Sequence, residues 1–143
     1  MKIFAGDLFS CCLSLALSAW SLSAAVEGRI TKAELGTDKT EKYEPVNPAT
    51  EFHPDTAQIV CVWTTQGVKA GTALRVVWIA EDVGKLAPPN YKIIELSMKT
   101  ETGVHGSSYL TKPNKGFPAG KYRLEIYLEG ELAKTVPFTI AAR

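Results

Sequence analysis

Cysteine is scarce in this chain of 143 residues: it has 3, and Cys11 and Cys12 lie in the apolar segment at its start. Without that segment only Cys61 remains, and a single cysteine excludes an intramolecular disulfide. Cys61 stands among apolar neighbours in AQIVCVWT, and free cysteine is one of the most buried residue types. We predict an inert core thiol, because a reactive thiol would need exposure and a positive environment.

Histidine is scarcer still. His53 and His105 are the 2 histidines, and neither has a Cys, His, Asp or Glu at a recurrent metal-ligand spacing. We expect each to be a surface loop or edge residue. The sequence also has no CxxC, no HExxH and no glycine-rich phosphate loop. It therefore predicts no metal site and no cofactor.

One short segment places a histidine beside serines. GVHGSSY holds His105, Ser107 and Ser108, and it is the one place where a hydrolase or small metal-carrier site would be sought. A hydrolase needs a nucleophile, a base and an orienting group that converge, whereas side chains this close in a strand or turn point in different directions. A Gly-Ser turn that opens a strand is the favoured interpretation. We predict no catalytic residues and no enzyme, with the His105/Ser107 region as the alternative.

The chain has no excess of charge and no block of like charges. Lys and Arg number 16, Asp and Glu number 15, and the formal net charge is +1. Attraction of nucleic acid or of an anionic membrane surface would need a basic face. Nucleic acid is therefore not an expected partner.

Charge is also missing from Leu8 to Val26, an apolar stretch between the basic start Met1-Lys2 and Ser23-Ala24-Ala25. This pattern is typical of a secretory signal peptide, which we predict at residues 1–25. The mature protein would then be exported, periplasmic or secreted, with no membrane span after cleavage. The alternative is an uncleaved membrane anchor, since a span needs about 20 apolar residues, but several serines weaken it.

The rest of the chain has the size of one ordinary domain. Val26–Leu35 alternates weakly and predicts a first strand at a sheet edge, and Gly36–Pro54 has few aliphatic residues and predicts a long connection. We assign residues 26–53 to this strand and loop, and residues 54–143 to the core of the domain.

The core region consists of short apolar runs separated by Gly and Pro, which predicts an all-β sandwich or barrel. ALRVVWIA is apolar on both faces apart from Arg75, as expected in the middle of a sheet. We therefore expect Arg75 to reach an end or an edge of that sheet. The runs are Ala57–Thr65, Thr72–Ala80, Tyr91–Lys99 and His105–Leu110, followed by a closing hairpin.

The closing hairpin alternates apolar and polar residues. Its apolar sets are Tyr122, Leu124, Ile126 and Leu128 on the first strand and Leu132, Val136, Phe138 and Ile140 on the second. A bare two-residue turn at Glu129-Gly130 would put the two sets on opposite faces. A three-residue connection, or a short turn with a bulge, places Leu124 beside Val136 and Tyr122 beside Phe138. Pro137 has no amide donor, so it must point away from the ladder or mark a bulge near an edge.

These residues resemble the immunoglobulin pattern. Trp78 on a third strand, and Tyr122 two residues before Leu124, are similar to the core tryptophan and the tyrosine corner of that family. Cys61 lies near the first family cysteine and Leu124 occupies the second. The resemblance implies an immunoglobulin-like antiparallel β-sandwich of about seven strands, in which packing replaces the disulfide. The arrangement is similar to immunoglobulin-like modules of bacterial exported proteins, and the likeness involves Phe52-His53-Pro54, the stretch from Gly71 to Trp78, and Phe138-x-Ile140.

The segment Pro118-Ala119-Gly120-x-Tyr122 is also similar to the end of periplasmic copper-resistance proteins of the C type. That resemblance implies copper on an N-terminal histidine, with further His, Asp or Met ligands. Here the expected mature start is Val26, and Met98 is the one methionine that follows it. The ligand set is therefore missing.

Aromatic residues supply the candidates for partner contacts. Trp63 and Trp78 fit core positions, whereas Tyr127, Tyr91 and Tyr109 are better candidates for exposed side chains, and Tyr127 shares the polar face of the hairpin with Arg123.

We predict a non-catalytic exported binding or accessory module of the cell envelope, whose partner is another envelope or extracellular protein or a surface polymer. Its contacts would come from loops at one end, Gln66–Gly71, Gly84–Asn90 and Pro113–Ala119, or from an exposed edge strand. A protease inhibitor that binds through its loops is a further alternative.

Overall fold

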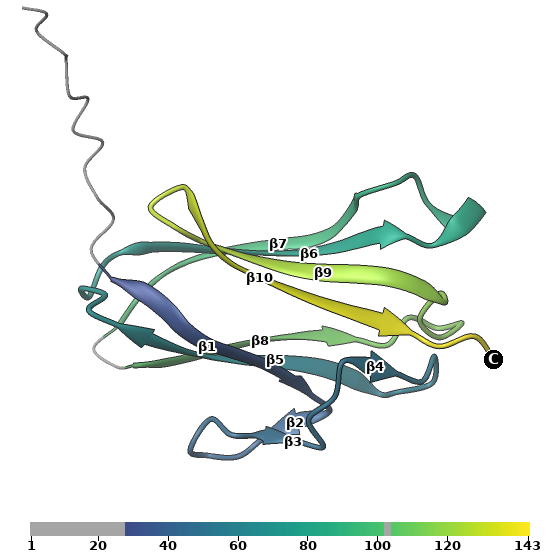
Figure 1. Ribbon diagram of the computed structural model, residues 1–143, viewed down its shortest axis with the longest axis horizontal. Coiled ribbons are helices and arrows are strands. Elements are labelled where there is room, and N and C mark those ends of the chain that lie inside the picture. The colour runs from purple at the N-terminus through teal and green to yellow at the C-terminus, as the bar shows by residue number, and fades with distance from the viewer. Residues whose placement is uncertain (1–27, 102–103) are drawn as a thin grey trace, which may run out of the picture.

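Two β-sheets lie face to face in the computed structural model, which describes residues 28–101 and 104–143 (Figure 1). The first sheet has the order β1 (Arg29–Gly36), β5 (Gln58–Gln66) and β8 (His105–Thr111). The second has the order β4 (Glu51–Phe52), β10 (Glu131–Ile140), β9 (Gly120–Leu128), β6 (Ala73–Asp82) and β7 (Tyr91–Lys99). Neighbours are antiparallel except β4 and β10. The all-β fold and the main strands are thus confirmed, whereas the predicted signal peptide at residues 1–25 lies outside the described residues.

The long connection predicted after Gly36 contains short strands. β2 (Asp38–Lys39) and β3 (Pro45–Val46) form a two-stranded hairpin beside the first sheet, and β4 pairs with the end of β10 (Figure 1). Strands of two residues are too short to show an alternating pattern, so the sequence did not indicate them. β1 is an edge strand of the first sheet, as expected. Its buried residues Ile30 and Leu35 belong to the common core.

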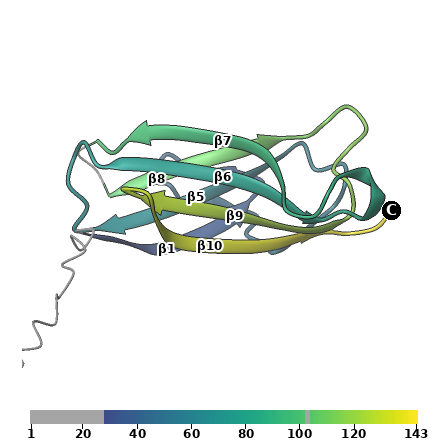
Figure 2. The same cartoon turned by 90° about the horizontal axis from the view of Figure 1, so that it is seen from above.

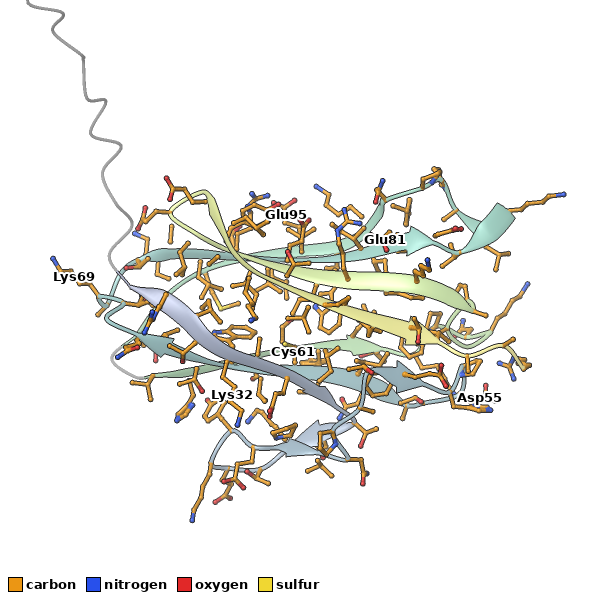
Figure 3. All side chains as sticks on the ribbon, viewed as in Figure 1. Lys32, Asp55, Cys61, Lys69, Glu81 and Glu95 are labelled. Carbon is orange, nitrogen blue, oxygen red and sulfur yellow. The ribbon has the colours of Figure 1, made fainter. Side chains whose placement is uncertain are left out.

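The core between the sheets is centred on Trp78. Trp78 and its cross-strand neighbour Leu124 are fully buried on β6 and β9, and Cys61 is fully buried on β5 of the facing sheet (Figure 3). Trp63 is buried as well, so the predicted core positions of Cys61 and of both tryptophans are confirmed. Burial raises the pKa of the Cys61 thiol to about 12, which keeps it protonated.

The closing hairpin has the predicted register: Leu124 pairs with Val136, and Tyr122 pairs with Phe138. The Phe138 ring contacts the Trp78 ring edge to face, with 5.9 Å between the centroids. It also stacks on Tyr122 at 5.2 Å. Figure 2 shows β9 and β10 side by side with β6 and β7 across the second sheet.

A short turn and a bulge produce this register. Glu129 and Gly130 form the turn with φ angles of 48° and 81°, as a two-residue hairpin requires. A bulge between Leu132 and Lys134 then restores the parity of the second strand. Leu132 lies before the bulge and is 53% exposed, so its predicted place in the core-facing set was wrong.

Pro137 lies where its missing amide donor does no harm. The backbone N–H of Thr139 donates to the carbonyl of Thr50, away from β9. Because N–H groups alternate sides along a strand, the nitrogen of Pro137 faces the same way. β4 pairs only with Thr139 and Ile140, so Pro137 faces an unpaired stretch, as predicted for a proline near an edge.

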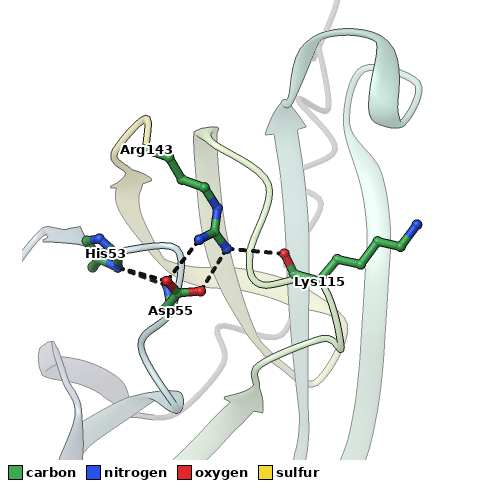
Figure 4. A network of polar contacts seen from close by, with 4 residues as sticks. All are labelled: His53, Asp55, Lys115 and Arg143. Atoms are coloured by element: carbon green, nitrogen blue, oxygen red, sulfur yellow. Dashed lines mark hydrogen bonds and ion pairs between the residues drawn. The ribbon is translucent and has the colours of Figure 1, made fainter.

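The end of the chain is tied back to the loop after β4. Arg143 Nη1 and Nη2 donate to the two carboxylate oxygens of Asp55 at 2.9 and 2.7 Å, and Nη2 also donates to the carbonyl of Lys115 at 3.3 Å (Figure 4). The Asp55 amide donates to His53 Nδ1 at 3.0 Å. The Arg143 guanidinium holds the pKa of Asp55 below its usual range. His53 is exposed in this loop, as predicted.

Across residues 28–101 and 104–143, no helix has the length and apolar character that crossing a membrane requires.

Candidate binding surface

The four residues predicted for partner contacts lie at three places. Arg123 and Tyr127 share the outer face of β9, Tyr91 begins β7 at one end of the sandwich, and Tyr109 is exposed on β8 in the other sheet. The fold thus brings only Arg123 and Tyr127 together.

Tyr127 is covered by a cation from the neighbouring strand. Arg75 Cζ lies 4.0 Å from the centroid of the Tyr127 ring. Arg75 Nη1 also donates to Glu95 Oε1 at 2.9 Å, and Lys92 Nζ reaches Glu95 Oε2 at 2.6 Å. Hydrogen bonds from Lys92 and Arg75 lower the pKa of Glu95. Arg75 thus reaches the edge strand β7 through Glu95, as expected, and it lies on the outer face of the sheet against the Tyr127 ring.

Arg123 has partners of its own on the same face. Its Nη1 donates to Asn90 Oδ1 at 2.7 Å and to Glu81 Oε1 at 3.1 Å. Beneath these side chains Val77 and Ile79 point away from the core but are only 4% and 7% exposed. The polar groups of this face therefore bind one another and cover apolar residues.

An apolar pocket opens at the end of the sandwich where β6 leads into β7 and β8 leads into β9. Its volume is about 220 Å³, and its lining side chains are apolar apart from Thr111 and the hydroxyls of Tyr91 and Tyr122. Leu86, at the rim, is 75% exposed. The other main lining residues are Val83, Ile93, Leu110, Pro113 and Phe117.

The rim of this pocket is a loop held by local hydrogen bonds. η1 (Gly84–Leu86) is a short 3₁₀ turn, and the Gly84 amide donates to Asp82 Oδ1 at 3.1 Å. Gly84 and Asn90 have φ angles of 67° and 55°, which glycine and asparagine tolerate best. The backbone N–H of Asn90 closes the loop by donating to the backbone carbonyl of Glu81 at 3.0 Å. The loop thus presents Leu86 to the solvent.

The floor of the pocket is held by a tyrosine corner. The Tyr122 hydroxyl donates to the carbonyl of Pro118 at 2.5 Å, the bond that defines this feature in immunoglobulin domains. Burial raises the pKa of Tyr122 to about 12. The Phe117 amide donates to the Pro54 carbonyl at 2.8 Å and so places its ring in the floor.

Two of the three loops predicted to share one end do so. Gly84–Asn90 and Pro113–Ala119 both contribute to the pocket. Gln66–Gly71 lies at the opposite end, because it precedes β6 whereas Gly84–Asn90 follows it. The prediction that all three form one surface was therefore wrong.

The exposed edge strand that was predicted as an alternative contact is present as β7. The inward-facing residues Ile94 and Met98 of β7 are 40% and 39% exposed, whereas their partners Trp78 and Leu74 on β6 are 0% and 3% exposed. β7 is the last strand of its sheet, so no further strand of this sheet covers the far side of these residues. An apolar strip is left on the underside of the β7 edge.

The His105 region shows no converging catalytic groups. The His105 ring stacks on Tyr43 with 5.5 Å between the centroids, and its Nδ1 lies 3.4 Å from the Thr64 hydroxyl. Ser107 lies two residues along the same strand, while Ser108 turns inward and accepts a hydrogen bond from Trp78. His105 is exposed on the edge strand β8, as predicted. In the part of the chain that the structure describes, no three His, Cys, Asp or Glu side chains are grouped to hold a metal ion.

Leu86 and Phe117 lie in two of the loops predicted for partner contacts, but neither residue was singled out. The available signal was an apolar side chain in each of two loops rich in Gly and Pro. The sequence placed the two loops at one end but could not show that these two side chains line one pocket, since 31 positions (117 minus 86) separate them.

The fold places this chain in the class of immunoglobulin-like β-sandwiches. Its described residues form seven long strands, with Trp78 on the third of them and Tyr122 at the tyrosine corner. The structure is similar to an immunoglobulin-like protein of Pseudomonas aeruginosa, with a TM-score of 0.55 and 15% identity, over 82% of this chain and 99% of that chain. The predicted fold family is thus confirmed. No protein-family model and no curated protein sequence matches the chain.

Weaker likenesses involve parts of longer proteins. An alkylpurine DNA glycosylase of Pseudomonas fluorescens matches with a TM-score of 0.46 and 13% identity, over 82% of this chain and 31% of that chain. A β-glucosidase of Bifidobacterium adolescentis matches with a TM-score of 0.41 and 15% identity, over 79% of this chain and 17% of that chain.

Proposed function

We propose that this protein is a non-catalytic, exported binding module, and that its end pocket holds an apolar side chain of another envelope or extracellular protein. The observation that carries the proposal is Leu86, a large apolar residue that is 75% exposed at the rim of an apolar pocket. Pockets with apolar lining and an exposed apolar rim are favoured places for binding.

The chemistry of the lining supports binding rather than catalysis. No Ser, Cys, His, Asp, Glu or Lys side chain lines the pocket, so the hydroxyls of Thr111, Tyr91 and Tyr122 have no strong general base beside them to activate them. The same lining favours a protein side chain over a surface polysaccharide, because sugar hydroxyls would find few polar partners there. Export rests on the predicted signal peptide.

The proposal is tested by capture from an envelope extract with three forms of the protein. Leu86→Asp places a carboxylate at the pocket rim and is expected to lose the partner that the wild type retains. Leu132→Asp is the matched control, because Leu132 is also an exposed leucine but lies in the β9–β10 hairpin at the opposite end. It is expected to retain the partner, and thermal unfolding establishes that both variants are folded.

The captured partner then allows a quantitative measurement. Loss of a leucine that becomes buried on binding weakens an interface by about tenfold or more. Calorimetry is expected to show that difference in Kd between Leu86→Asp and Leu132→Asp, with a negative heat-capacity change for the wild type. A wild type that retains no protein, or equal retention by Leu86→Asp, contradicts the proposal.

A further inference from the structure

The outer edge of β7 carries backbone groups without a strand partner. β7 pairs with β6 along one side only, since it is the last strand of the second sheet. Such an edge is a template on which another strand can form hydrogen bonds. The exposed apolar strip beneath it, which includes Ile94 and Met98, is the second unsatisfied feature of the same strand.

We propose that β7 pairs antiparallel with β7 of a second copy of this chain, about a twofold axis at Ser97. Ser97 of one copy lies opposite Ser97 of the other in this register. Glu95 then lies opposite Lys99, and Leu96 lies opposite Met98, with each pair occurring twice because a twofold interface is self-complementary. The two second sheets join into one continuous sheet.

The charges of β7 select this register. Glu95 and Lys99 both lie on the outer face of the strand, opposite Val77 and Ala73 in the ladder with β6. Opposite charges that face each other across an antiparallel pair are favourable, and like charges are not. A register centred on Glu95 would place two carboxylates together. Arg75 and Lys92 already contact Glu95, but a carboxylate has about four acceptor sites and can bind a further ammonium.

The regular part of β7 is long enough for the pairing. The register between β6 and β7 shifts between Ile94 and Lys92, so the bulge precedes Ile94. Ile94–Lys99 follows without interruption. A bulge turns an edge away from partners, which restricts the pairing to this segment.

The apolar strip gives the pairing its driving force and points to a second copy as the occupant. Leu96 and Met98 of each copy meet on the inward-facing side of the joined strands, where Met98 is 39% exposed in the single chain. Ile94 extends the cluster on both sides of the axis. A partner strand needs apolar residues and a cation at alternating positions, and β7 itself supplies both.

Sedimentation of the protein, purified as the cell processes it, tests the proposal over a concentration series. The wild type is expected to form a reversible dimer. In Lys99→Glu, the new carboxylate of each copy lies opposite Glu95 of the other copy, so the interface holds two repulsive pairs. This is expected to raise the dimer Kd about tenfold or more. Lys42→Glu is the matched control, because Lys42 is exposed in the hairpin beside the first sheet, and it is expected to leave the Kd unchanged.

A mixing experiment tests the register itself. Glu95→Lys alone places two cations opposite each other and is also expected to weaken the dimer. Mixed with Lys99→Glu it restores both attractions, so the mixture is expected to form a heterodimer that neither variant forms with itself. In the wild type, the backbone amides of β7 are expected to exchange hydrogen more slowly as concentration rises.

A wild type that stays monomeric at the highest concentration, or a Lys99→Glu variant with an unchanged Kd, overturns the proposal. So does a mixture that associates no better than its components. Leu86→Asp separates the two proposals: it alters the end pocket, and it is expected to leave the dimer intact.

Discussion

The indole nitrogen of Trp78 donates a hydrogen bond to the Ser108 hydroxyl at 2.9 Å, and this bond joins the two sheets through the core. Trp78 lies on β6 of the second sheet and Ser108 on β8 of the first, and both are buried. Within residues 28–101 and 104–143, no buried side-chain nitrogen or oxygen lacks a hydrogen-bond partner. The bond therefore removes the one polar cost of burying the central tryptophan.

Removal of the Ser108 hydroxyl is expected to leave the Trp78 N–H unpaired in the core. Ser108→Ala should lower the free energy of unfolding by about 1–3 kcal/mol, the cost of an unsatisfied buried donor. Ser107→Ala is the control, since Ser107 is its neighbour on β8 but points outward, and it should change stability little. Urea denaturation followed by tryptophan fluorescence measures both, and equal stabilities would show that the bond contributes nothing.

The tyrosine corner should contribute both to stability and to its dependence on alkaline pH. Tyr122→Phe deletes the bond to Pro118 and is expected to cost about 1 kcal/mol, whereas Tyr109→Phe at an exposed site should cost almost nothing. The folded pKa of Tyr122 is about 12, above its ordinary value of 10.0. The contribution of neutral Tyr122 to the free energy of unfolding is thus complete below pH 10 and is lost as the pH rises to about 12. The wild type should lose more stability than Tyr122→Phe over that range in urea titrations, and parallel curves would exclude the contribution.

Gly106 is expected to tolerate no side chain. A Cβ atom there would lie 2.3 Å from Trp63 Nε1, so the indole of a core tryptophan would have to move. Overpacking of this kind costs about 1–3 kcal/mol. Gly106→Ala should show that loss in denaturation, together with a changed near-ultraviolet circular dichroism signal from tryptophan. A variant as stable as the wild type would mean that the Trp63 ring moves without cost.

The Asp55–Arg143 pair is expected to make the stability of the protein depend on pH in the acid range. Arg143 lowers the pKa of Asp55 from its ordinary value of 3.8, so its contribution to stability is present above that value and is lost as the pH falls through the folded pKa. Arg143→Ala should bring the Asp55 pKa back toward 3.8 and make stability less dependent on pH in the acid range. Carbon-detected NMR titration measures the pKa. Because both side chains are solvent-exposed, the effect on stability at neutral pH should be small.

Local alternation was sufficient to predict the strands and the register of the closing hairpin. The pairing of Leu124 with Val136 followed from the sequence because a strand with one buried face cannot slip by one residue without exposing its apolar set. The burial of Cys61 and Trp78 followed from their apolar neighbours in the same way.

Contacts between distant segments could not be predicted in this manner. The partners of Arg75 were not predicted, because Tyr127 and Glu95 belong to two other strands. The two loops of the end pocket were predicted to share one end, but the pocket itself was not, because Leu86 and Phe117 come from separate loops. Leu132 was misplaced because a bulge has no sequence signal as strong as a turn.

The amino-acid sequence by itself determined the β class, the approximate positions of the long strands and most of the inward-facing residues of the closing hairpin, because each depends on neighbours along one strand. Only the tertiary structure decided which surfaces remain for partners. Ile94 and Met98 of the edge strand β7 stay partly exposed, and the two loops that form the pocket meet only when the sheets close. Exposure of a side chain depends on what lies above it in space, and that information is not contained in any one strand.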